Sequence, residues 1–372
     1  MGEVTVNKQK KKETGDWYDY GPIKKLKCQY NMIIGERSNG KTYGALKEII
    51  KNYVENKKKG AYIRRYKEDY RGKRGDALFE SIEADGVVTE MTEGKFNCIK
   101  YQSGRWYFAI SDPETGKKMA CEDPFCYAFA ISDMEHDKST SYPDVTTIVF
   151  DEFLTRGYYL PNEFVLFMNT LSTIIRHRND VTVYMLANTV NKYAPYFGEM
   201  GLKHIQQMEK GQIDVYTYGN SKLKVAVEYC ASPKKEGKKS DVYFAFDNPS
   251  LELITGGAWE LDIYPHCPDS YDKKDIKFCF FMEFEEELLQ GEVVMNNEDN
   301  YIFVHRKSTP LRNPKKDLVF SLKASPRANY VTGFSSSSLG IAQKIRRYFQ
   351  LGKVFYQDNE VGEIVRNFIK EG

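Results

Sequence analysis

The amino-acid sequence predicts an α/β protein, with a P-loop NTPase domain built on a mostly parallel sheet and a small α+β domain at the C-terminal end. Three observations support this prediction. A phosphate-loop motif lies at Gly35–Thr42, a buried-strand pattern ends in Asp151 and Glu152, and strand and helix patterns alternate from Tyr30 to about Met200.

The motif at Gly35–Thr42 matches every fixed position of the Walker A pattern G-x-x-x-x-G-K-[ST]. A buried-strand pattern, Tyr30–Ile34, precedes it, and apolar residues at helical spacing follow from Tyr43 to Asn56. In such a loop the backbone N–H groups bind phosphate oxygens, the lysine reaches the β- and γ-phosphates, and the threonine hydroxyl binds Mg²⁺. We therefore expect ATP to bind at Gly35, Glu36, Arg37, Ser38, Asn39, Gly40, Lys41 and Thr42, with Lys41 also acting in catalysis. A glycine-rich turn that merely opens a helix is the alternative.

A second motif lies about 110 residues further on. The β-favouring residues Thr147–Phe150 are followed directly by Asp151 and Glu152, which places both carboxylates at the end of a buried strand. In open α/β sheets ligands bind at this edge. We interpret the pair as Walker B, with Asp151 holding Mg²⁺ together with Thr42 and with Glu152 orienting the attacking water. A plain turn after the strand is the alternative.

The remaining patterns of this part extend the same sheet. They predict a strand near Gly60–Arg64, a hairpin of residues 96–101 and 106–110, strands at Cys126–Ile131 and Val181–Ala187, and a helix from Pro161 through Ile175 that ends in Arg176-His177-Arg178. Asn188 follows the last of these strands. We expect it either to contact the γ-phosphate or to cap the next segment.

Four segments are expected along the chain: a basic N-terminal arm (1–27), the P-loop ATPase domain (28–205), a connecting subdomain (206–270) and a C-terminal domain (271–372). The last begins with strand patterns at Ile276–Glu283, Glu292–Met295 and Tyr301–His305. A helix near Leu339–Leu351, a strand at Lys353–Tyr356 and a helix at Val361–Lys370 follow. This order resembles an RNase H-like fold. We expect it to be non-catalytic, because the adjacent carboxylates near Glu283–Glu287 would point to opposite faces of a strand.

Positive charge is concentrated near the phosphate loop. Residues 1–75 contain 20 Lys or Arg against 9 Asp or Glu, whereas the whole chain has a net charge of only +2. The basic run from Arg64 to Arg74 could follow a nucleic-acid backbone, could reach an anionic ligand, or could be a charged surface loop. No apolar stretch of 18 residues is present, so no membrane partner is expected, and the protein should stay in a cytosol.

Taken together, these motifs, the basic run Tyr62–Lys67, the loop Ser139–Pro143 and the segment Pro161–Glu163 resemble the genome-packaging (encapsidation) ATPases of small short-tailed double-stranded DNA phages, the phi-twenty-nine group. The resemblance covers about residues 28–205 closely. It implies an ASCE-type (RecA-like) ATPase, related to chromosome-pumping hexameric translocases, that assembles as a homo-oligomeric ring, usually a pentamer.

By the same resemblance the ring would sit on the portal vertex of an empty capsid and drive double-stranded DNA inward with ATP and Mg²⁺. Arg176 would be the arginine finger and Lys138 a second basic residue acting on the neighbouring subunit's nucleotide. The C-terminal domain would dock on the capsid, in some members through a structural packaging RNA. The protein would work in the host-cell cytoplasm, transiently on the capsid, and be absent from the mature virion.

Two other functions remain open from the residues. A nucleoside or small-molecule kinase would share the phosphate loop but would need an acceptor pocket. An assembly protein could bind nucleotide only to fix its conformation, with hydrolysis idle.

Overall fold

The computed structural model describes most of the chain, in two compact units, Met1–Glu260 and Leu261–Gly372. The described residues are 4–10, 17–37, 39–136, 140–155, 157–189, 193–219, 223–230, 264–267, 271–284, 287–296, 299–307, 309, 311, 313–333 and 340–371. Two expected site residues, Ser38 and Lys138, therefore lie outside them, as do residues 231–263 of the expected connecting subdomain. None of the described helices is long and apolar enough to cross a membrane.

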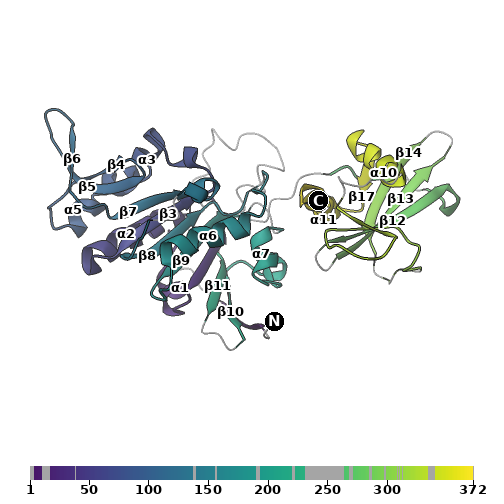
Figure 1. Cartoon of the computed structure of the whole chain (residues 1–372), viewed down its shortest axis with the longest axis horizontal. Coiled ribbons are helices and arrows are strands. Elements are labelled where there is room, and N and C mark those ends of the chain that lie inside the picture. The colour runs from purple at the N-terminus through teal and green to yellow at the C-terminus, as the bar shows by residue number, and fades with distance from the viewer. Residues whose placement is uncertain are drawn as a thin grey trace. The chain divides into compact units, whose positions relative to one another are not determined.

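The first unit is built on one large mixed sheet (Figure 1). Its described strands run in the order β1 (Val4–Lys10), β10 (Gln212–Tyr218), β11 (Lys224–Tyr229), β2 (Tyr30–Gly35), β9 (Thr182–Asn188), β8 (Val145–Asp151), β3 (Lys59–Arg64), β7 (Cys126–Ala130), β5 (Arg105–Ser111) and β4 (Cys98–Gln102), with β6 (Lys118–Ala120) beside β5. The central strands from β11 to β7 are parallel, and both edges are antiparallel. The centre therefore confirms the predicted parallel sheet.

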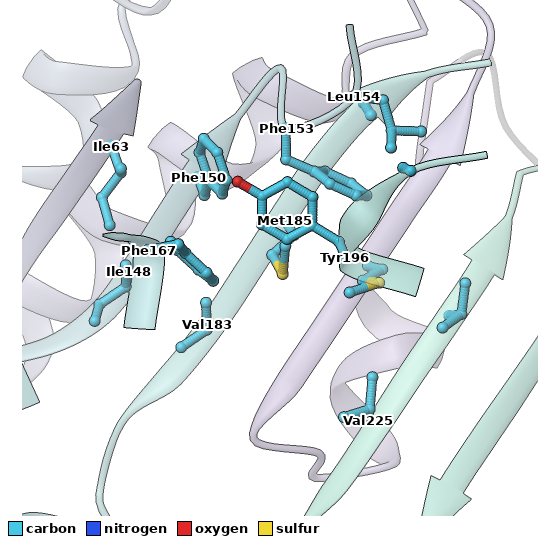
Figure 2. Packing of buried hydrophobic residues seen from close by; sticks show 14 of the residues in the cluster. Ile63, Ile148, Phe150, Phe153, Leu154, Phe167, Val183, Met185, Tyr196 and Val225 are labelled. Carbon is cyan, nitrogen blue, oxygen red and sulfur yellow. The ribbon is translucent and has the colours of Figure 1, made fainter. Parts of the chain in front are cut away.

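Helices cover both faces of this sheet, because its central strands are apolar on both sides. On one face lies α2 (Lys41–Asn56), whose Leu46, Ile49 and Ile50 are buried. The other face packs against α6 (Glu163–Ile175) and α7 (Pro195–Glu199). Figure 2 shows the ring of Tyr196 lying among Phe150, Phe153 and Met185, in the hydrophobic core between the sheet and these two helices.

The expected boundaries differ from the structure at both ends of the first unit. The expected arm, 1–27, contains β1, which pairs along its whole length with β10, and the short helix α1 (Gly21–Lys25). In the expected connecting subdomain, 206–270, β10 and β11 belong to the main sheet, because β11 pairs in parallel with β2. Backbone pairing between segments about 200 residues apart in sequence has no local pattern that could reveal it.

Short helices fill the stretch between β3 and β4, which the sequence indicated only as polar and charged. They are the 3₁₀ turn η1 (Lys67–Asp69) and the helices α3 (Lys73–Ala77), α4 (Glu80–Ala84) and α5 (Val87–Met91). Two further 3₁₀ turns are η2 (Ile131–His136) and η3 (Ile205–Gln207). The predicted hairpin is confirmed: β4 and β5 pair around the two-residue turn Ser103-Gly104, where both residues have positive φ.

The second unit holds a mixed sheet of its own. Its strands run in the order β16 (Tyr330–Thr332), β15 (Val319–Ser321), β12 (Ile276–Phe284), β13 (Glu287–Met295), β14 (Asn300–Arg306) and β17 (Val354–Tyr356). The predicted meander of β12, β13 and β14 is confirmed, and β15 and β17 flank it in parallel. The turn η4 (Lys273–Asp275) leads into β12, and the helices α10 (Gly340–Gln350) and α11 (Asn359–Glu371) bury one face each.

Candidate nucleotide-binding site

The phosphate loop closes around the side chain of Lys41. Strand β2 ends at Gly35, and α2 begins at Lys41 after Gly40, whose φ of 87° a residue with a side chain would adopt only with strain. The Lys41 Nζ donates to the Glu36 carbonyl at 2.6 Å and to the Asn39 Oδ1 at 3.0 Å. Burial lowers the pKa of Lys41, while the charges of Cys230, Asp151 and Glu36 act in the opposite direction. The loop thus holds a buried cation at its centre, as phosphate binding requires.

The end of β9 brings Asn188 to the same place. Strand β9 lies between β2 and β8, and Asn188 is the register partner of Gly35. The Asn188 Oδ1 lies 3.5 Å from the Lys41 Nζ, and the backbone N–H of Thr189 donates to the Gly35 carbonyl at 3.2 Å. An amide at this position can contact whatever anion Lys41 contacts.

Asp151 ends β8 directly beside Thr42. Its Oδ2 accepts hydrogen bonds from the Thr42 hydroxyl and from the Tyr62 hydroxyl, each at 3.0 Å. Burial raises the pKa of Asp151, Arg64 opposes that shift, and Glu152 adds to it. A hydroxyl and a carboxylate oxygen in contact are hard ligands of the kind that Mg²⁺ prefers, so these residues fit the expected metal.

Glu152 lies one residue past the strand, in a different setting. Its φ of 57° turns the backbone away from the sheet, and its side chain is 59% exposed. The Arg64 Nη2 donates to the Glu152 carboxylate at 2.6 Å, and the Arg64 Nη1 lies 3.9 Å from the Asp151 Oδ2. Arg64, at the end of β3, therefore links both carboxylates.

The next residue, Arg65, faces the other side of the sheet. Its guanidinium forms a two-pronged ion pair with Glu163, with both N–O distances 2.8 Å, and also donates to the Phe153 carbonyl at 2.8 Å. The Tyr196 hydroxyl donates to the same carboxylate at 2.7 Å. This buried network fixes the segment that follows Glu152.

One of the three alternatives for this run, a charged surface loop, is wrong for Arg64 and Arg65, because Arg64 ends β3 and is only 15% exposed, and Arg65 is buried in its ion pair with Glu163. Sequence reasoning also missed Tyr62. One pattern could have found Arg64 and Tyr62: they are two residues apart near the carboxyl end of a strand, so they share a face at the edge where ligands bind.

Arg176 lies apart from the loop. It follows α6 with a φ of 53°, is exposed, and donates from Nη2 to the Thr140 carbonyl at 3.0 Å. Within the described ranges its side chain makes no hydrogen bond or ion pair with Gly35–Thr42. Its neighbour Arg178 is structural, since one Nη2 donates to the carbonyls of Tyr142, Val145 and Ile174.

Comparisons with known proteins point to a family of phage proteins. The family model described as "Podovirus DNA encapsidation protein (Gp16)" matches residues 17–235. A "DNA packaging protein" of Bacillus phage B103 is 31% identical over 175 residues, which is 46% of this chain and 48% of that protein. The protein of the same description from Bacillus phage phi29 is 29% identical over 183 residues, which is 48% of this chain and 48% of that protein. The chain thus spans about half the length of the curated relatives it matches.

A solved structure shares the fold over nearly the whole chain. A chain of "The bacteriophage Phi-29 viral genome packaging motor assembly" superposes with a TM-score of 0.56 at 19% identity, covering 96% of this chain and 100% of that chain. Because the family model covers more than half of the sequence, from the segment before the phosphate loop to the strand β11 beyond it, this chain belongs to the podovirus DNA encapsidation protein (Gp16) family.

Proposed function

We propose that this chain is an ATP-driven translocase that moves double-stranded DNA into a preformed phage capsid through the portal. One observation carries the chemistry: Lys41, Thr42, Asp151, Glu152 and Asn188 come from three separate segments and meet at one edge of the sheet. The matching phage proteins are named DNA packaging proteins, which supports movement of DNA into the capsid.

The proposed roles follow from the contacts. Lys41 and the backbone of the loop bind the phosphates of ATP, and Thr42 and Asp151 hold Mg²⁺, which supplies charge neutralisation at the phosphates. Glu152 accepts a proton from, and orients, the attacking water, and its exposed carboxylate leaves room for that contact. Arg64 holds the Glu152 carboxylate in place. Asn188 contacts the γ-phosphate beside Lys41.

The class within P-loop enzymes is part of the proposal. An additional strand, β9, separates the phosphate-loop strand β2 from the carboxylate strand β8, which supports an ASCE-type domain with a catalytic glutamate. A small-molecule kinase has no need for a glutamate beside the metal ligand, and idle hydrolysis would leave Glu152 without a role.

The remaining parts of the proposal concern the assembly. Arg176 is exposed, and its side chain bonds to Thr140 and not to the phosphate loop of its own chain. This supports action on the nucleotide of a neighbouring subunit in a ring, which we propose to be a pentamer. Lys138 is proposed for the same interface. In the second unit, the strand order β14-β13-β12-β15-β16 supports an RNase H-like module that docks on the portal vertex, directly or through a packaging RNA. Such a protein acts in the host cytoplasm, binds the capsid transiently and is absent from the finished virion.

Steady-state ATP hydrolysis with and without double-stranded DNA tests the proposal. We expect DNA to stimulate turnover, and we expect Glu152→Gln to lower it by about 10²- to 10⁴-fold, because the water loses its base. Lys41→Ala should abolish both binding and turnover. Arg74→Ala, which removes an exposed charge outside the site, is the matched control.

Two results would contradict the proposal. Turnover that is indifferent to DNA would remove the translocase assignment, and a Glu152→Gln protein with wild-type turnover would remove the catalytic base.

A further inference from the structure

A cavity lies in the first unit, outside the phosphate site. It has a volume of about 580 Å³, and its walls come from the turn before α3, the β4–β5 turn, the end of β7 and the segment Thr140–Tyr142. None of the residues Gly35–Thr42, Asp151 or Glu152 lines it. Its volume falls in the range of about 300–1,000 Å³ typical of small-molecule sites.

Basic side chains outnumber acidic ones in its lining. Lys67, Arg71 and Arg105 are basic, and Asp133 is the acidic residue among the described lining residues. Lys67 is neutralised by Asp133, with the Nζ and Oδ2 2.7 Å apart. Arg71 has no ion pair in the part of the chain that the structure describes. The charges of Arg71 and Arg105 are therefore available to an anion.

Aromatic rings form much of the remaining wall. Tyr70, Tyr101, Tyr127 and Tyr142 all line the cavity. The rings of Tyr127 and Tyr142 pack edge to face with centroids 5.1 Å apart, and the Arg105 guanidinium lies 5.9 Å from the Tyr127 ring centre. Aromatic faces beside guanidinium groups are the arrangement on which unpaired bases stack while their phosphates are neutralised.

The walls are held in position before any ligand binds. The Ser103-Gly104 turn is fixed on β7 by the Ala128 N–H, which donates to the Gly104 carbonyl at 2.8 Å. Gly75 packs so closely that an added Cβ would lie 2.4 Å from the Tyr70 carbonyl and 2.7 Å from the Tyr101 ring. A preformed site loses little conformational entropy on binding.

We propose that this cavity is a second nucleotide-binding site, which takes a nucleoside phosphate with an unpaired base. Arg71 and Arg105 bind the phosphate, and the base stacks on Tyr127. The ligand is either a free nucleotide or an unpaired nucleotide of a DNA strand, since both present the same phosphate and base. The site does not depend on hydrolysis at the phosphate loop.

Fluorescence anisotropy of the full chain with two probes tests this proposal. One probe is a labelled single-stranded oligothymidylate of 12 nucleotides, and the other is labelled thymidine 5′-monophosphate. We expect the double variant Arg71→Ala/Arg105→Ala to weaken binding of at least one probe by about 10- to 100-fold, because two charged contacts to phosphate are lost. Loss with the oligonucleotide alone identifies a DNA strand as the ligand, and loss with the mononucleotide alone identifies a free nucleotide.

The controls separate this site from the phosphate loop and from general charge. Arg74→Ala removes a cation three residues from Arg71 that does not line the cavity, and it should change affinity less than about twofold. The slope of log affinity against log salt for the oligonucleotide should fall by roughly 1.4 in the double variant, since about 0.7 is lost per phosphate contact. Tyr127→Leu should weaken binding by about fivefold or more through lost stacking.

The proposal is overturned if the double variant binds both probes like the wild type, or if it and Arg74→Ala lose affinity equally. Basal ATP turnover, measured on the same proteins, should be unchanged. If the wild type does not hydrolyse ATP while the double variant still loses affinity for a probe, the proposed ATPase activity is wrong, and the nucleotide site in this cavity is still supported.

Discussion

Arg64 and Arg65 are adjacent in sequence, identical in chemistry and opposite in role. Arg64 lies on the face of the sheet that carries α2, where it pairs with the exposed carboxylate of Glu152. Arg65 lies on the face that carries α6 and α7, where it is buried against Glu163 and Tyr196. The pleat of a strand end sends consecutive side chains to opposite faces.

The difference shows how a buried ion pair supports the backbone that carries an exposed carboxylate. Glu152 sits in a turn with positive φ, a conformation that needs support from its surroundings. Arg65 gives that support by donating to the carbonyls of Glu152 and Phe153, at 3.3 Å and 2.8 Å. Arg64 then sets the direction of the carboxylate. Substitutions at the two positions should therefore separate stability from turnover.

The largest effect is expected for Arg65→Ala. The substitution leaves the Glu163 carboxylate buried without its ion-pair partner, so the first unit should lose about 3–5 kcal/mol of its free energy of unfolding. Urea unfolding followed by tryptophan fluorescence measures this directly, because Trp17, Trp106 and Trp259 all belong to residues 1–260. Arg74→Ala, an exposed pair, should stay within about 0.5 kcal/mol of the wild type. A loss below about 1 kcal/mol for Arg65→Ala would mean that the network does not support the turn.

A smaller effect, on turnover, is expected for Arg64→Ala. Without the guanidinium the Glu152 carboxylate loses its fixed direction, so the rate constant for ATP hydrolysis should fall by about 10- to 100-fold. Arg64→Lys keeps the charge without the planar fork and should recover part of the loss. If Arg64→Ala hydrolyses ATP at the wild-type rate, the 2.6 Å ion pair has no part in catalysis.

The smallest effect is the pH dependence of Asp151→Asn. Because burial raises the pKa of Asp151 above its ordinary 3.8, the folded protein binds this proton more tightly than the unfolded chain does. That stabilisation is complete below the ordinary pKa and is lost as pH rises through the folded one, at no more than about 1.4 kcal/mol per pH unit. The asparagine variant has no such loss, so its stability relative to the wild type should rise between pH 4 and pH 8. Asp123→Asn is the reference for removing an exposed carboxylate, and a constant difference for Asp151→Asn would refute the shift.

The sequence predicted the parts of the fold that have short-range patterns. The strand–loop–helix around Gly35–Thr42, the strand that ends at Asp151 and the hairpin around Ser103-Gly104 lie where their periodicity placed them. The three C-terminal strands are also present, although β13 begins at Glu287 and not at Glu292. Asn188 was identified from its place at a strand end, and the parallel sheet carries it to Lys41. Its proposed contact with the γ-phosphate stays a prediction, as do the roles of Lys138 and Arg176.

The sequence by itself determined the motifs, a phosphate loop and two carboxylates after a buried strand, and a family resemblance that the comparisons bear out. Only the tertiary structure decided where the basic residues lie relative to these motifs. Arg64 lies at the site, Arg65 is buried in the core, and Arg71 and Arg105 line a separate cavity. The charge composition of the sequence does not depend on the direction in which an arginine side chain points. Its partners depend on strand pleat and on pairing between segments that are remote in sequence, and no local pattern encodes either.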